Sequence, residues 1–361
     1  MSISLDEASK LSEDILVKGI IETIIKDSPI LQELPFIQIV GNSLKYNRES
    51  VLPTVNFYDV GDTWVESTPE FEAVSAVLRI LGGDADVDNF LKSTRSNVTD
   101  LETAVIEQKA KALRHEFEKS FIQGNAATNA KQFDGIHKVI GGTAWTASTA
   151  YVVGDVVVPE AGEENGFRYV CTVAGTSHTA NPVWPTVEGG SIAETTGVTW
   201  VCHYGGNLSA GTGAAGTVTP GALTLTKLDN LIDLVRGGKP DILLMSRVSR
   251  RRIAVLARAA GTNLEVGKGL LGETVQFYNG IPIAISDWVL DNLGPSSNCT
   301  TIYAFQMGEG AVCGLSSPEM IQVERLGSLE TKDAARTRIK WYCSLALFST
   351  VNAAMLSWMS S

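Results

Sequence analysis

Histidine is the side chain best suited to acid–base catalysis near neutral pH. The chain has four: His115, His137, His178 and His203. His115 lies beside Glu116 and Glu118 in a predicted helix, a pattern more typical of a solvated helix face than of a general base. His178 and His203 lack the spacing of metal ligands, and we interpret them as surface residues. Motifs for a nucleophile elbow, a zinc protease, a phosphate loop or dinucleotide binding are absent from the sequence. We therefore predict that the chain is not an enzyme and uses no cofactor or metal.

Five cysteines are the second set of reactive side chains: Cys171, Cys202, Cys299, Cys313 and Cys343. Their odd number and the lack of CxxC spacing argue against a disulfide framework and against a structural zinc site. The first residues contain neither the basic region nor the apolar core of a signal peptide. No apolar run reaches the roughly 18 residues needed to cross a bilayer. We expect an intracellular product with reduced, buried thiols and no membrane partner.

Aromatic side chains crowd between residues 143 and 206, where they could bind a ligand by stacking. They are Trp145, Tyr151, Phe167, Tyr169, Trp184 and Trp200. Exposed rings stack on sugar faces, but a segment this small also needs rings to build a core. The core interpretation is favoured for most of them. Trp184, which is flanked by two prolines, is the best candidate for an exposed, glycan-stacking ring.

Four arginines form the main basic cluster: Arg247, Arg250, Arg251 and Arg252. They could neutralise DNA phosphates non-specifically, pair with acids of a neighbouring subunit, or form a solvated first turn of a helix. No aromatic residues alternate with them, so stacking on a single strand is not indicated. The net charge of −11 argues against general nucleic-acid binding, and an interface or a solvated face is favoured.

The elements that position these residues begin with a helix and a ribbon. The composition, 44% hydrophobic and 19% charged, is that of a globular protein. Residues 5–34 show helical periodicity. Residues 42–60 and 70–82 alternate as two strands that end at Gly82-Gly83, a ribbon with little core of its own that needs support from outside. Residues 99–123 form the strongest predicted helix, with an apolar stripe and a stop at Gly124.

The composition of the chain changes twice in the rest of the sequence, near residue 143 and again at residues 207–221. From about residue 143, short strands are predicted at 151–158, 167–173 and 198–203. Residues 207–221 have the composition of a flexible linker. Two helices follow at 226–235 and 250–260, the second capped by Ser249, and then a hairpin over 276–285 with an Asn-Gly turn. Further strands are predicted at 301–306, 310–315, 320–326 and 336–349.

Three stretches carry a family resemblance. Residues 52–57 (LPTVNF) and 84–88 (DADVD) look like the ascending and closing parts of an extended loop. The helix 99–123 runs into FIQGN at 121–125 and FDGI at 133–136, and GIPI at 280–283 looks like a hairpin of an axial domain. In order and spacing these stretches resemble the tailed-phage (Caudovirales) major capsid proteins of the Hong Kong 97 type. Residues 143–206 resemble a chitin-binding-like, carbohydrate-binding-module-like β domain through AYVVGDVV at 150–157, PVWP at 182–185 and VTW at 198–200.

The resemblance implies an α+β fold of the Hong Kong 97 type with an all-β insertion domain. Its expected parts are an N-terminal arm (1–42), a two-stranded extended loop (43–82), a peripheral domain with the spine helix 99–123 (83–142), an inserted aromatic β module (143–206), an axial domain (207–317) and a peripheral-domain sheet with the C-terminus (318–361).

The same resemblance implies a structural virion protein that assembles with itself into pentamers and hexamers. These would form an icosahedral shell around packaged double-stranded DNA, which the inner face would contact non-specifically. Further implied partners are separate scaffolding, portal and decoration proteins. The insert is expected to project outward, where it would brace the shell or bind host-surface glycans. Assembly is expected in the host cytoplasm. Two alternatives stay open: an encapsulin-like nanocompartment shell, and a carbohydrate-binding surface-adhesion protein.

Overall fold

The computed structural model describes residues 29–51, 55, 57–64, 70–90, 101–212, 219–261, 264–268, 274–293, 298–328 and 333–361. These residues form two compact units, each of which mixes helices and strands. The first unit contains the described residues up to 44 together with 76–135 and 313–346, and the second contains those of 45–75, 136–312 and 347–361. The helix predicted over 5–34 lies outside the described residues except for its end, where α2 spans Pro29–Glu33. Among the described helices, none is long and apolar enough to span a bilayer.

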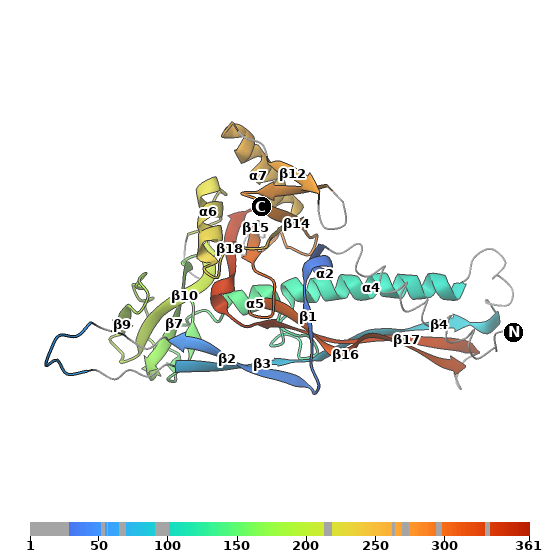
Figure 1. Cartoon of the computed structure of the whole chain (residues 1–361), viewed down its shortest axis with the longest axis horizontal. Coiled ribbons are helices and arrows are strands. Elements are labelled where there is room, and N and C mark those ends of the chain that lie inside the picture. Colours follow the sequence, from blue (N-terminus) through green and yellow to red (C-terminus); the bar gives the residue numbers. More distant parts are fainter. Residues whose placement is uncertain are drawn as a thin grey trace. The chain divides into compact units, whose positions relative to one another are not determined.

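A long helix, α4 (Leu101–Gln123), packs on a four-stranded sheet in the first unit (Figure 1). The strand order is β1 (Phe36–Gln38), β16 (Val312–Ser328), β17 (Ala334–Leu347) and β4 (Arg79–Asp88). The predicted apolar stripe is buried, and Phe117 stacks on Trp341 of β17 with 4.6 Å between ring centroids. The Trp341 indole donates to Ser316 Oγ of β16 (3.1 Å), so its one polar atom is satisfied inside the core.

Gly124 ends α4 at a close crossing of backbone segments. A Cβ at this position would lie 2.4 Å from the carbonyl oxygens of both Ser120 and Phe133. The Gly135 amide donates to the Gly124 carbonyl at 2.8 Å. The helix stop predicted here is therefore correct. Gly124 is not among the glycines with positive φ, so a left-handed cap does not explain the stop. A glycine is needed here because a side chain would clash where two backbone segments approach.

The ribbon consists of β2 (Ser43–Val51) and β3 (Glu70–Val77), which pair as a two-stranded sheet. The predicted end of its second strand at Gly82-Gly83 is wrong. β3 ends at Val77, and the amide of the next residue, Leu78, donates to the Asn42 carbonyl (2.9 Å). β4 then runs from Arg79 through both glycines to Asp88. Antiparallel pairing with β17 supplies the backbone hydrogen bonds that carry β4 past the glycines.

The second unit is organised by a ten-stranded sheet. Its strands, in spatial order, are β12 (Glu265–Lys268), β13 (Thr274–Tyr278), β14 (Ile281–Ile285), β11 (Ile242–Met245), β15 (Cys299–Phe305), β18 (Ala353–Ser360), β10 (Thr199–Ser209), β7 (Asn165–Val173) and β6 (Val156–Val157), with β9 (Ser191–Ala193) also on β10. A separate pair joins β5 (Ala150–Tyr151) to β8 (Gly175–Thr176). The unit also contains α5 (Ile136–Gly141) and a 3-10 turn, Thr350–Asn352.

Two helices of this unit, α6 (Leu225–Leu234) and α7 (Arg247–Ala259), bury their apolar faces in one core with β11, β15 and β18. The predicted hairpin is confirmed: Asn279 and Gly280 have φ of 52° and 67°, as the tight turn between β13 and β14 requires. The predicted cap of the second helix is displaced by three residues. Ser246 is the cap, and its Oγ accepts a hydrogen bond from the amide of Ser249, which is buried in the first turn.

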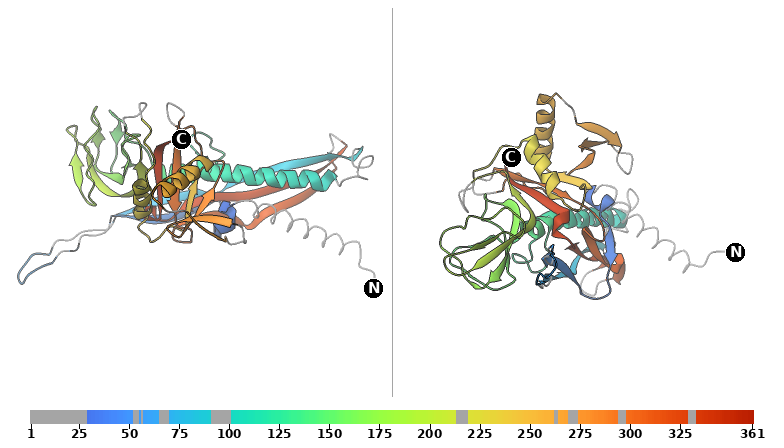
Figure 2. Two further views of the ribbon diagram at one scale, coloured as in Figure 1. Left: turned by 90° about the horizontal axis from the view of Figure 1, so that it is seen from above. Right: turned by 60° about the vertical axis from the view of Figure 1, so that its left-hand side comes forward.

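Strand β10 continues beyond residue 206, into the predicted linker. It pairs in parallel with β18, placing Asn207, Leu208 and Ser209 beside Met355, Leu356 and Ser357. Residues 207–209 are therefore strand, and β18 lies in the ten-stranded sheet although we predicted 318–361 as part of the other sheet. Figure 2 shows the green strands of residues 143–209 gathered into one β-rich part. Local sequence could not reveal this pairing because its partners are about 150 residues apart.

Candidate functional site

The segment between β2 and β3 carries four exposed large apolar side chains. Phe57 and Val60 are 107% and 102% exposed, Val55 is 89% and Trp64 is 78% exposed. We call residues 55 and 57–64 the tip. Apolar groups gathered in the open are typical of a surface that binds another protein. Burying each such side chain would contribute about 1.5–3 kcal/mol.

Hydrogen bonds and ring stacking hold the tip in shape. The Asp59 amide donates to Asp62 Oδ2 (2.7 Å), and the Val60 amide donates to Asp59 Oδ1 (2.7 Å). The rings of Tyr58 and Trp64 stack with 4.4 Å between centroids. Because the turn is formed before any partner arrives, little conformational entropy remains to be lost on binding.

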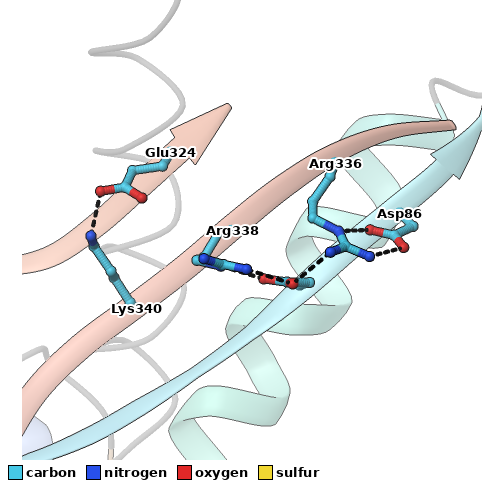
Figure 3. Close-up of polar contacts among 6 residues, drawn as sticks. Asp86, Glu324, Arg336, Arg338 and Lys340 are labelled. Atoms are coloured by element: carbon cyan, nitrogen blue, oxygen red, sulfur yellow. Dashed lines mark hydrogen bonds and ion pairs between the residues drawn. The ribbon is translucent and has the colours of Figure 1, made fainter. Parts of the chain in front are cut away.

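Paired charges cover one face of the four-stranded sheet (Figure 3). Arg336 donates to both carboxylate oxygens of Asp86 (2.7 Å each), and Arg338 donates to those of Asp84 (2.7 and 3.0 Å). These four residues are cross-strand neighbours on β4 and β17, so their side chains share a face. A slip of one residue would place them on the opposite face, and the pairs therefore help to fix the register.

The charge pairing extends to β16. Lys340 of β17 forms an ion pair with Glu324 of β16 (Figure 3). The hydrogen bonds from Arg338 lower the pKa of Asp84, more than burial raises it. The contribution of Asp84 to stability is therefore present above the ordinary carboxyl pKa and is lost as the pH falls through the lowered one. At neutral pH the pairs are intact, and their basic members are not free to bind phosphates.

The aromatic residues singled out in the sequence come together in one cluster. Trp145, Tyr151, Tyr169 and Trp200 are buried in it, together with Cys171 and Cys202. Rings enclosed in this way cannot stack on a sugar. Phe167 and Trp184 are only partly buried and pack against the cluster, and the Trp184 ring lies 4.2 Å from that of Tyr169 between centroids. Glycan stacking thus stays a prediction for Trp184 alone.

Two acids that sequence reasoning missed, the buried Glu194 and the exposed Glu188, bind side chains of this segment. Glu194 accepts hydrogen bonds from the indoles of Trp145 (3.1 Å) and Trp200 (2.6 Å) and from the His178 amide (2.5 Å). Glu188 accepts from His203 Nδ1 (2.8 Å), which is buried, so the interpretation of His203 as a surface residue is wrong. In the sequence these acids look like any others in an acidic stretch, since only the fold brings the donors to them.

A second buried acid, Glu164, connects the middle segment to β18. It accepts from the Trp358 indole (2.7 Å) and the Gly162 amide (2.6 Å). Trp358 has a φ of 56°, in the left-handed region that a bulky residue rarely adopts. The hydrogen bond therefore holds a strained point of β18 in place.

Burial raises the pKa of Glu164, and hydrogen bonds from Trp358 and from backbone amides oppose this only in part. An acid whose pKa is raised on folding gives stability that is full below its unfolded pKa and falls as the pH rises through the folded one. We therefore expect the melting temperature of the unassembled wild type, relative to Glu164→Gln, to fall by a few °C between about pH 4.5 and pH 8. Thermal melts across this range, with Glu160→Gln as the control, test it; a difference that does not change with pH would contradict the expectation.

The four arginines of α7 do not form one site. Arg247 makes a two-point ion pair with Asp287 (2.6 and 2.9 Å). Arg250 donates to Gln276 Oε1 (3.2 Å), and Arg252 binds Ser360 and Ser361 at the end of β18. Arg251 is exposed. Of the four, Arg251 is thus the one whose charge is most available to a partner. Within the described ranges, no group of three His, Cys, Asp or Glu side chains is arranged to hold a metal ion.

Comparison with known proteins gives a consistent result. The model of the SU10 major capsid protein family matches residues 66–338, which is most of the chain. The chain is similar in structure to the holo-SrpI encapsulin complex from Synechococcus elongatus PCC 7942 (16% identity, TM-score 0.58, 93% of this chain and 89% of that chain). It is also similar to the capsid of an empty GTA particle (14% identity, TM-score 0.54, 92% of this chain and 90% of that chain). A third similar structure is the capsid of cyanophage P-SCSP1u (13% identity, TM-score 0.50, 92% of this chain and 88% of that chain). No curated protein sequence matches it. At sequence identities this low, the structural similarity shows a shared fold only.

Proposed function

Because the chain belongs to the SU10 major capsid protein family, it is a shell-forming structural protein of a virion capsid, and we propose that its copies close into pentamers and hexamers of an icosahedral shell around packaged double-stranded DNA. Its action is assembly and not the turnover of a substrate. Heterologous contacts between copies close into rings when the rotation between neighbours allows it.

The observation that carries this proposal is the exposed tip. A two-stranded ribbon has too little core to be stable alone, and this one displays Val55, Phe57, Val60 and Trp64 to solvent. A neighbouring copy would supply the missing burial, as we expected for an extended loop over 43–82. The predicted separate scaffolding, portal and decoration proteins would add to these contacts, and assembly would take place in the host cytoplasm.

For the middle segment, residues 143–206, we propose shell bracing ahead of glycan binding. Its last strand pairs with β18, Glu164 binds Trp358, and the Arg236 guanidinium lies 3.5 Å from the centre of the Tyr204 ring. These contacts favour a rigid part of the subunit. The segment would face outward, where Trp184 is the one candidate left for a surface glycan.

The test is negative-stain microscopy of the purified protein, combined with measurement of its nucleic acid. Closed particles that protect DNA from nuclease when isolated from virions are the expected result. Closed shells without DNA would favour the encapsulin-like alternative, which the similarity to the SrpI encapsulin complex supports. A protein that stays monomeric at high concentration and binds chitin would overturn the shell function and favour the surface-adhesion alternative, although the buried rings remove most of its support.

A further inference from the structure

A histidine and a tyrosine join α5 to the ten-stranded sheet within the second unit. Nδ1 of His137, in α5, lies 2.9 Å from the hydroxyl of Tyr303, in β15. The two rings also meet edge to face, with 6.1 Å between centroids and 84° between planes. Tyr303 is 2% exposed, and His137 is half-buried. A side chain that titrates near neutral pH is therefore bonded to a buried hydroxyl.

The helix α5 needs contacts of this kind because it is short. Its six residues make fewer than two turns, and an isolated helix of that length is not stable in water. Ile136 and Ile140 are buried, and the bond of His137 adds a polar contact in the first turn. The chain passes from the first unit to the second between Gly135 and Ile136, so α5 is the first element after this crossing. Release of α5 would therefore loosen the second unit where the chain enters it.

The protonation state of the His137 ring decides whether this contact is favourable. Burial raises the pKa of Tyr303, so its hydroxyl stays protonated and can donate to Nδ1 of a neutral imidazole, which then carries its own proton on Nε2. When the ring takes up a second proton, at Nδ1, both ring nitrogens become donors. The new N–H then faces an O–H, and the contact is kept only if the hydroxyl turns its proton away. Proton uptake thus weakens the contact and places a positive charge in a partly buried site.

The strands around α5 in the second unit offer this positive charge no carboxylate. α5 packs on β10, β18 and β15, and it lines one cavity together with β7. These four strands contain no Asp or Glu, and Glu188 is already bound to the His203 ring and the Tyr204 amide. The titratable and charged side chains in this region are Lys138, Arg168, His203, Tyr204, Cys299 and Tyr303. Burial, to which the charge of Lys138 adds, lowers the pKa of His137.

We propose that His137 is a pH switch: in mildly acidic solution its ring takes up a proton, the contact with Tyr303 is lost and α5 is released from the ten-stranded sheet. The switch is a property of the folded subunit and acts whether or not copies assemble. A histidine whose pKa is lowered on folding gives stability that is full above its unfolded pKa, about 6.5, and is lost as the pH falls through the lowered value. α5 is therefore held at neutral pH and released below it.

Thermal melts of the unassembled protein test the switch. His137→Asn supplies a neutral side chain whose Oδ1 can accept from Tyr303 near the place of Nδ1, and it takes up no proton. Between about pH 7.5 and about pH 5, the melting temperature of the wild type is expected to fall by several °C relative to this variant. His115→Asn is the matched control, because His115 is exposed on α4, and its difference from the wild type should not change with pH. An equally constant difference for His137→Asn would overturn the switch.

Hydrogen exchange followed by mass spectrometry locates the change. After correction for the intrinsic exchange rates, the α5 amides of the wild type should exchange about tenfold faster at about pH 5 than at about pH 7.5, while those of α6 keep their protection. In His137→Asn, α5 should stay protected at both pH values. Protection of α5 that does not depend on pH in the wild type, or a loss that His137→Asn shares, would overturn the switch and leave the shell function standing.

Tyr303→Phe is a second variant, which keeps the aromatic packing and removes the hydroxyl. Its α5 amides should exchange fast at both pH values, because the contact is missing whatever the state of the His137 ring. If His137→Asn does not fold, the comparison of the wild type with Tyr303→Phe decides the question. A dependence on pH as large in Tyr303→Phe as in the wild type would show that the bond between the two rings is not the switch.

Discussion

Replacing Phe57 and Trp64 together by serine is expected to abolish particle formation and to leave the subunit folded. Both side chains are largely exposed in the single chain, at 107% and 78%, so their loss removes no core. In a shell each tip would lose about 3–6 kcal/mol of apolar burial. Since every 1.4 kcal/mol changes an association constant about tenfold, the concentration needed for assembly should rise by a factor of about 10²–10⁴.

Sedimentation and negative-stain microscopy would measure this effect. Val183→Ser is the matched control, because Val183 is 89% exposed but lies in the middle segment, outside the tip. Its particles should form as those of the wild type do. If the Phe57→Ser, Trp64→Ser variant also assembles at wild-type concentrations, the tip is not the main contact between copies.

Glu194→Ala is expected to have the largest effect on folding. The substitution takes the acceptor away from two buried indoles and one amide at once. Each buried donor left without a partner costs about 1–3 kcal/mol, and the sum is comparable with the whole stability of a typical domain. The second unit should therefore unfold at a much lower urea concentration, with an early change in tryptophan fluorescence because Trp145 and Trp200 are in the affected core.

Glu194→Gln separates hydrogen bonding from simple disruption. The glutamine carbonyl oxygen can still accept from both indoles, which bind the same carboxylate oxygen in the wild type. The backbone N–H of His178 alone then faces the glutamine NH2 group, which is also a donor. An intermediate loss of stability is expected for this variant. Equal losses for alanine and glutamine would mean that the carboxylate acts by its charge and not as a hydrogen-bond acceptor.

Local patterns predicted those parts of the fold that depend on nearby residues. The stripe of α4 appears every third or fourth residue, the Asn279-Gly280 turn follows from backbone sterics, and the ring cluster follows from the small size of the middle segment. The order of the elements also came from local patterns, and the family resemblance added the type of fold. The extended ribbon was predicted from the alternation of its residues. Its need for a partner, argued from its small core, stays a prediction.

The features that the sequence did not predict share a physical cause. Each depends on contacts with residues that are distant in the sequence. β4 passes through Gly82 and Gly83 because β17 pairs with it, and residues 207–209 are strand because β18 lies beside them. Glu194 is distinguished only by donors that arrive from elsewhere in the fold.

The position of β18 has a consequence for the making of the protein. It lies between β15 and β10 and is the strand that joins the two halves of the ten-stranded sheet. A ribosome adds roughly 5–20 residues per second, so roughly 8–30 s pass between the synthesis of β10 and that of its neighbour β18, about 150 residues later. During that time the sheet of the second unit is incomplete. Nascent chains on crowded polysomes would thus be delayed in joining a growing particle until β18 has been synthesised.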